Sequence, residues 1–251
     1  MLIAPTGKNM TNAKQAWVTI IRKRRRDHGE VDRQRVQICD GRFSASLQAP
    51  EYSATLFYSG KNTRPALFSD WLGDSLVPAD NSTSLMPITL GQYSKLIRPG
   101  FEKGGESYGY RQSFHLVPIQ ANIEALDIVH DTYFDGVRSM PSDVTDFVTG
   151  IAWNPVTTEF LAASNMGIGC PQGAEEPPVF WAEETLAWKY AKDDAIIEIF
   201  IKTANENITA QLEAIDALSS FFCLNDTGTG QPVFETYPPE NLERLKKIRC
   251  K

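Results

Sequence analysis

The stretch Asn205–Leu224, NENITAQLEAIDALSSFFCL, decides how the chain is organised. Its large apolar residues recur at spacings of three, four and seven positions: Ile208, Leu212, Ile215 and Phe222. These spacings place them on one face of a helix. Asn207 is a suitable N-cap, and the sequence NDTG at 225–228 is typical of a helix end. We predict a helix over 205–224 that lies on a core, with Leu212 and Ile215 largely buried.

The segments on either side of this helix are less regular. Residues 195–202, AIIEIFIK, are rich in isoleucine, which favours a strand. We predict a helix over 181–192 and a short basic helix that begins at Pro239 and runs to Lys251. Residues 165–178 contain three glycines and three prolines, so they form a long loop, and a domain break would fall there. Otherwise we predict a single domain over residues 1–251.

The N-terminal half has the residue pattern of an antiparallel sheet. Residues 16–21, 35–39, 42–48 and 52–58 are rich in β-branched and aromatic residues or alternate polar with apolar ones. Asp40-Gly41 is typical of a hairpin turn. A further strand over 108–117 precedes a helix over 122–134. We therefore predict an α+β fold: an N-terminal antiparallel sheet (a meander), with helices from the C-terminal half packed on it.

Composition narrows the class of protein. Apolar residues make up 42% of the 251 positions and charged residues 22%, which is ordinary for a soluble globular protein. No apolar run approaches the roughly 18–20 residues that a membrane span needs. The N-terminus has no charged start followed by an apolar block. We expect a cytoplasmic or otherwise intracellular protein, or a virion component.

Charge is distributed unevenly along the chain, although the net charge is only -6. Residues 14–45 contain nine lysines or arginines against four acidic residues, whereas residues 46–251 contain fifteen basic and 27 acidic residues. A basic N-terminal region on an acidic remainder indicates either contact with a polyanion or head-to-tail self-association.

The densest part of the basic region is the run RKRRR at 22–26. Guanidinium groups form two-bond contacts with phosphate, and aromatic side chains on neighbouring strands can stack on bases. The predicted contact residues are Arg22, Lys23, Arg24, Arg25, Arg26, Arg33, Arg35 and Arg42. The predicted stacking residues are Phe43, Tyr52 and Tyr58. Two other interpretations remain open: a solvated edge that prevents strand pairing, and a salt contact with another protein.

No pattern of catalytic or metal-ligating residues stands out. The four cysteines, Cys39, Cys170, Cys223 and Cys250, form no C-x-x-C pair, and no phosphate-binding loop, zinc-protease motif or serine-nucleophile motif occurs. His130 and Asp131 are adjacent, and adjacent helix residues do not face each other. Asp131 and Asp135, like Glu184 and Trp188, are four apart and would share a helix face. We therefore predict no catalytic residues, no metal and no cofactor.

These observations favour a non-enzymatic subunit of a larger protein or nucleoprotein assembly, of viral or phage type or similar. Its expected partners are other copies of itself or other subunits, with nucleic acid as a further partner and no membrane. One alternative is a free-standing protein that binds single-stranded nucleic acid. A second is a hydrolase with an unrecognised acidic site.

Overall fold

The computed structural model describes residues 87–105, 108–141, 144–158 and 178–249, the single residues 66, 160, 162 and 172, and the backbone of three strands within 34–58. Its strands are β1 (Gln34–Ser44), β2 (Glu51–Tyr52), β3 (Thr55–Tyr58), β4 (Arg111–Gln120), β5 (Val148–Val156) and β6 (Val179–Trp188). Its α-helices are α3 (Leu90–Ile97), α4 (Ile123–Arg138), α6 (Asp194–Ala214) and α7 (Pro239–Arg249). Short 3-10 turns are η3 (Arg98–Phe101), η4 (Ala191–Asp193) and η5 (Phe234–Thr236). The fold is α+β, as predicted.

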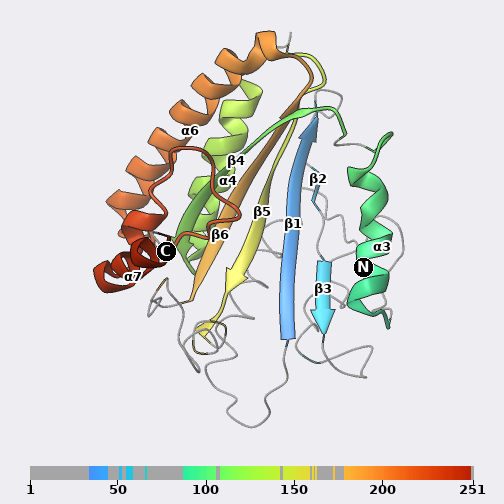
Figure 1. The fold of residues 1–251 in the computed structure, drawn as a ribbon. Coiled ribbons are helices and arrows are strands. Elements are labelled where there is room, and N and C mark those ends of the chain that lie inside the picture. The colour runs from blue at the N-terminus through green and yellow to red at the C-terminus, as the bar shows by residue number, and fades with distance from the viewer. Residues whose placement is uncertain are drawn as a thin grey trace.

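The strands pair in the order β2-β1-β5-β6-β4, with β3 also paired to β1, and every described pairing is antiparallel (Figure 1). Three neighbouring strands of the sheet, β5, β6 and β4, come from the middle of the chain, after residue 110. The prediction that an N-terminal meander forms the sheet is therefore wrong. β1, β2 and β3 only extend one side of it, and residues 16–21 lie outside the described part of the chain.

The predicted hairpin turn at Asp40-Gly41 is also wrong. β1 runs without interruption through both residues, and its partner β5 continues alongside it. The register between these two strands shifts between Ile38 and Gly41, which is the signature of a β-bulge. A residue pair that favours a tight turn can equally occupy a bulge, because both need a local departure from regular strand geometry.

The prediction of a helix over 181–192 is wrong, because Val179–Trp188 form strand β6. Even-numbered residues of this strand lie on one face and are buried: Phe180, Ala182, Glu184, Leu186 and Trp188. The odd-numbered residues from Trp181 to Ala187 are only partly buried. A two-residue period in burial belongs to a strand with one face on the core. β4 pairs with β6 along its whole length and β5 pairs with residues 179–187, which fixes this conformation.

α6 begins and ends about ten residues before the predicted 205–224 helix. It includes residues 195–202, so the prediction of a strand there is wrong. Its buried residues extend the helical spacing back to its first turns: Ile197, Phe200, Ala204, Asn205, Ile208 and Leu212. Leu212 is fully buried, as predicted, whereas Ile215 is only partly buried.

The end of α6 is a Schellman motif. Asp216 has a φ of 52°, its N–H donates to the carbonyl of Glu213, and the N–H of Ala217 donates to the carbonyl of Leu212. Glycine or asparagine usually occupies this left-handed position, so the aspartate concealed the stop. The chain then runs beside β4, where Leu218 bridges Ile119.

The main core lies between the sheet and two helices. α4 and α6 pack side by side against one sheet face, at the β4 and β6 side of the molecule (Figure 1). The largest fully buried side chains include Trp153 from β5, Phe180 from β6, and Tyr133 and Phe134 from α4. Helix α4 overlaps the predicted 122–134 helix and continues beyond it to Arg138, with Asn122 as its N-cap. In the described part of the chain, no helix is both long and apolar enough to cross a membrane.

Candidate functional site

Part of the predicted basic strip can be located on the sheet. Arg35, Arg42 and Phe43 are positions of β1, Tyr52 belongs to β2, and Tyr58 ends β3. The remaining predicted contact residues lie outside the described part of the chain: Arg22, Lys23, Arg24, Arg25, Arg26 and Arg33. The backbone of three paired strands therefore holds five of the eleven predicted positions.

The strand register brings these five positions into two groups. Tyr58 pairs with Gln34, so it is one step from the position opposite Arg35. Tyr52 pairs with Gly41, next to Arg42. Each tyrosine position is thus adjacent to an arginine position across a strand pair. Positions directly opposite in an antiparallel pair share a sheet face, and successive positions alternate between faces. The register therefore places each of these tyrosine positions on the face opposite to that of its neighbouring arginine position.

A second group of polar residues is buried between the sheet and the two packed helices. This buried polar cluster consists of Tyr133 on α4, Thr149 on β5, Glu184 on β6 and Asn205 on α6. Thr149 Oγ1 donates to the carbonyl of Thr185 at 2.9 Å, and the Tyr133 hydroxyl bonds to Thr149 Oγ1. Because a hydroxyl has one proton to donate, Tyr133 is the donor to Thr149.

Glu184 is the ionisable centre of the buried polar cluster. Its side chain is fully buried, and Asn205 Nδ2 donates to Glu184 Oε2 at 2.7 Å. Burial raises the pKa of Glu184 to about 8, against a smaller opposing effect of the Asn205 hydrogen bond. Burial, together with the nearby Glu184 carboxyl, also raises the pKa of Tyr133 well above its ordinary value. Both side chains are therefore neutral at pH 7.

His115 lies beside this cluster, opposite Glu184 in the β4–β6 register. Burial lowers its pKa to about 4. Gln231 Nε2 lies 3.3 Å from His115 Nε2 and donates to the carbonyl of Leu116 at 2.8 Å. Gln231 Oε1 accepts from the N–H groups of Leu116 and Gly228. The Gln231 amide thus forms hydrogen bonds with part of the outer edge of β4. The second proton of Gln231 Nε2 is donated to His115 Nε2.

Sequence reasoning missed Glu184 as a buried group. The signal is present, because Glu184 interrupts a two-residue apolar alternation from Phe180 to Trp188. The prediction of a helix for this segment hid this signal, because helical spacing places Glu184 and Trp188 together on an outer helix face. A carboxyl among core positions is the kind of group whose pKa shifts most.

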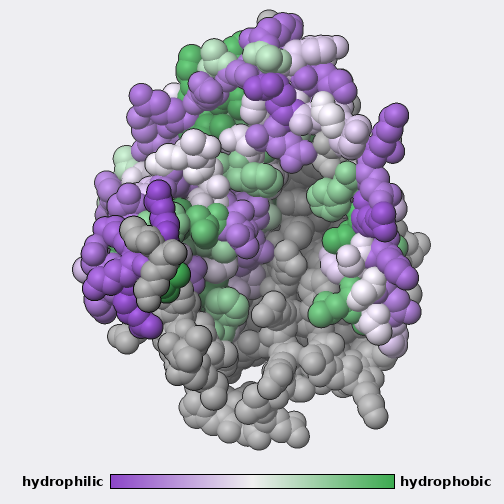
Figure 2. All heavy atoms as spheres, viewed as in Figure 1, coloured by the Kyte–Doolittle hydropathy of each residue, from purple (hydrophilic) through white to green (hydrophobic). Residues whose placement is uncertain are grey.

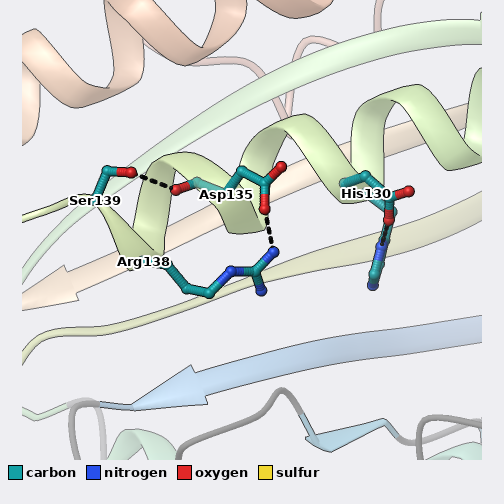
Figure 3. Close-up of polar contacts among 5 residues, drawn as sticks. His130, Asp135, Arg138 and Ser139 are labelled. Atoms are coloured by element: carbon teal, nitrogen blue, oxygen red, sulfur yellow. Dashed lines mark hydrogen bonds and ion pairs between the residues drawn. The ribbon is translucent and has the colours of Figure 1, made fainter.

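The histidine and the two aspartates that the sequence analysis considered on α4 pair with neighbouring side chains on the same helix (Figure 3). His130 Nδ1 lies 2.6 Å from Asp131 Oδ1, so the expectation that these neighbours do not interact is wrong. Arg138 pairs with Asp135, and Ser139 Oγ donates to the Asp135 carbonyl at 2.9 Å. Asp131 and Asp135 are thus partners of two separate basic groups.

Helix α3 presents large apolar side chains to solvent. Thr89 and Gln92 form a capping box at its start, and no residue of the helix is buried. Leu90 is 81% exposed, and Phe101, just beyond the helix, is 70% exposed. Three further exposed apolar residues lie in the same segment: Ile88, Leu96 and Ile97. Figure 2 shows hydrophobic surface along this segment, at the right of the view.

Comparison with known proteins assigns no relationship. No protein-family model, curated protein or solved structure matches this chain. Within the described ranges, no three histidine, cysteine or acidic side chains gather as a metal-binding group. The candidate sites are therefore the basic and aromatic positions of β1–β3, the apolar surface of α3, and the buried polar cluster.

Proposed function

We propose that this protein is a non-enzymatic subunit of a larger protein or nucleoprotein assembly, of viral or phage type or similar. In this proposal its basic N-terminal strip contacts the acidic surface of a neighbouring copy. The observation that carries the proposal is the separation of opposite charges along the sheet. The basic positions Arg35 and Arg42 are on β1, which β5 and β6 separate from β4.

The acidic side of the molecule is the outer surface of the two packed helices. α4 and α6 each contain four acidic residues and one basic residue. Exposed carboxylates include Asp131, Asp135 and Glu206, with 69%, 71% and 66% of their side-chain surface accessible. A subunit that is basic at one end and acidic at the other favours a head-to-tail contact, which builds rings or filaments.

The exposed apolar side chains of α3 support the same proposal. An apolar patch at the surface of a soluble protein commonly marks an interaction site. Lys95 and Lys103 lie in the same segment, and Arg98 is paired with Glu102, so the segment carries a net positive charge as well as apolar side chains. A basic and apolar helix complements an acidic neighbour in charge, and its burial against that neighbour would remove Leu90 and Phe101 from water.

A charge-exchange experiment tests the proposal. The variant Arg24→Glu/Arg25→Glu/Arg26→Glu makes the basic strip acidic, and Glu198→Lys/Glu206→Lys/Glu213→Lys makes the α6 surface basic. Each variant alone should be a smaller oligomer than the wild type by size-exclusion chromatography with light scattering, because each carries like charges on both surfaces. An equimolar mixture should assemble again, since each surface meets its opposite charge in the other variant.

The control for this experiment is Lys246→Glu/Lys247→Glu/Arg249→Glu, which reverses three basic residues of α7 and should leave the oligomer unchanged. Added salt should dissociate the wild-type assembly, because it screens exposed charges. A wild type that is monomeric at low salt, or two variants that assemble like the wild type, would contradict the proposal.

The alternative is a free-standing protein that binds single-stranded nucleic acid. The basic run at 22–26 and the aromatic positions Phe43, Tyr52 and Tyr58 on β1–β3 favour it. A monomeric wild type that binds oligonucleotides would then be expected. In Arg24→Ala/Arg25→Ala/Arg26→Ala, each lost phosphate contact should reduce the slope of log affinity against log salt by about 0.7 for single strands. Unchanged binding by this variant would exclude the strip as the contact site.

A further inference from the structure

The orientation of the Asn205 side chain is fixed by its surroundings. Asn205 Nδ2 donates to the carbonyl of Ile201 at 2.9 Å and to Glu184 Oε2 at 2.7 Å. A backbone carbonyl can only accept a hydrogen bond, so the nitrogen, and not the oxygen, of the amide must point toward it. The amide oxygen Oδ1 therefore lies on the side of the amide group that points away from the Ile201 carbonyl.

Two oxygen atoms remain without a donor at this point. In the described part of the chain, Glu184 Oε1 and Asn205 Oδ1 are both buried and lack a hydrogen-bond partner. Glu184 Oε1 shares its carbon atom with Oε2, and Asn205 Oδ1 shares its carbon atom with Nδ2. Nδ2 and Oε2 are the two atoms that the 2.7 Å hydrogen bond joins. Two buried acceptors without a donor are costly, typically by about 1–3 kcal/mol each. One proton on the carboxyl group would satisfy both.

We infer that Glu184 is a proton-binding site in the core: its carboxyl group carries a proton on Oε1 and donates it to Asn205 Oδ1. With the bond from Asn205 Nδ2 to Glu184 Oε2, this completes a two-bond pair of a carboxylic acid and a carboxamide. The pair joins strand β6, which has a partner strand on each side, to the longest described helix, α6. It goes beyond the proposed assembly function and is independent of it.

The groups that face Glu184 from each packed element favour the protonated form. α4 contributes the Tyr133 phenol, β4 contributes His115, and β5 contributes the apolar Ile151 directly opposite. None of the ion pairs found among the described residues includes Glu184. Burial keeps Tyr133 and His115 neutral as well, as their shifted pKa values indicate. Among the described residues, no neighbouring positive charge stabilises a carboxylate here.

Loss of the proton should weaken the contact between β6 and α6. A Glu184 carboxylate would place a negative charge beside the Asn205 Oδ1 acceptor in the core. Because the pKa of Glu184 is raised from 4.5 to about 8, the folded state holds a proton that the unfolded state has released. Stability from this group is complete below pH 4.5, falls as the pH rises toward about 8, and is lost above that value.

Infrared spectroscopy of the full chain, labelled with carboxyl-¹³C glutamate, tests the inference. The difference between wild type and Glu184→Gln should show the C=O band of a protonated carboxylic acid at about pH 6, well below the raised pKa. That band should disappear with a midpoint near pH 8. Its absence at about pH 6 would overturn the inference, and because the wild type supplies the signal, the variant's stability does not decide the result.

Thermal unfolding provides the second measurement. Glutamine at position 184 retains the two-bond pattern without an ionisable proton, so Glu184→Gln should lose the fall in unfolding temperature that the wild type shows from about pH 5 to about pH 8. The matched control is Glu183→Gln, at a partly buried position on the opposite face of β6. The control should keep both the infrared band and the wild-type pH dependence. A Glu184→Gln profile parallel to that of the wild type would contradict the inference.

Discussion

Arg111, the first residue of β4, and Asp194, the first residue of α6, form a two-bond ion pair. Arg111 Nε lies 2.5 Å from Asp194 Oδ1, and Nη2 lies 2.7 Å from Oδ2. Trp188, the last residue of β6, donates from Nε1 to the same Oδ1 at 2.8 Å. One carboxylate therefore connects two neighbouring strands to the helix that covers them, although Arg111 and Asp194 are 83 positions apart.

We expect Arg111→Lys to lower the unfolding temperature slightly. Lysine keeps the charge but cannot form the two parallel hydrogen bonds of a guanidinium group. Although burial opposes ionisation, the hydrogen bonds from Trp188 and Arg111 and the Arg111 charge lower the pKa of Asp194. The stability from this pair is therefore present above the ordinary aspartate pKa and is lost as the pH falls. Calorimetry above and below the ordinary aspartate pKa should show a difference in unfolding temperature between wild type and variant. This difference should become smaller at the more acidic pH. A difference that widens there would contradict this assignment.

Leu212→Ala should destabilise the protein by roughly 2–5 kcal/mol, because the side chain is fully buried in the core. Ile199→Ala is the matched control on the same helix, since Ile199 is 66% exposed. We expect this control to change stability by at most about 0.5 kcal/mol. Chemical denaturation measures both values. Equal losses for the two variants would mean that α6 is rotated from the orientation described here.

Gln231→Ala should open the edge of β4 locally. The amide of Gln231 bonds to both the N–H and the carbonyl of Leu116, so its removal leaves two strand groups without partners. A buried unsatisfied group costs about 1–3 kcal/mol. Hydrogen exchange at the Leu116 and Gly228 amides should accelerate markedly. The control is Gln211→Ala, an exposed glutamine on α6, which should leave exchange at these amides unchanged.

The ring of His115 should remain neutral to well below pH 6. Its pKa is lowered from 6.5 to about 4 by burial, so the unfolded state binds a proton that the folded state does not. Stability from this group is therefore lost as the pH falls from 6.5 toward 4, by at most about 1.4 kcal/mol per pH unit. NMR titration of the ring measures its pKa directly. A midpoint near 6.5 would contradict the buried placement beside Glu184 and Gln231.

The sequence determined the elements whose signals are local. The spacing of apolar residues placed α4 close to its position, and Pro239 marked the start of α7. Leu212 was identified as a core residue because a three-and-four spacing places it on the buried stripe. The α+β class followed from the mixture of alternating and helical patterns. The charge layout is also a property of the sequence alone, and the proposed assembly depends on it.

Only the tertiary structure decided which conformation the ambiguous segments adopt. Residues 181–188 satisfy both a helical and a strand pattern, and they form a strand because β4 and β5 supply hydrogen bonds on both sides. Residues 195–202 form a helix because Ile197 and Phe200 extend the buried stripe of α6. The buried polar cluster unites Tyr133, Thr149, Glu184 and Asn205 from four elements, so no local pattern contains it. Burial then sets the pKa of Glu184, because desolvation depends on the neighbours that the fold supplies.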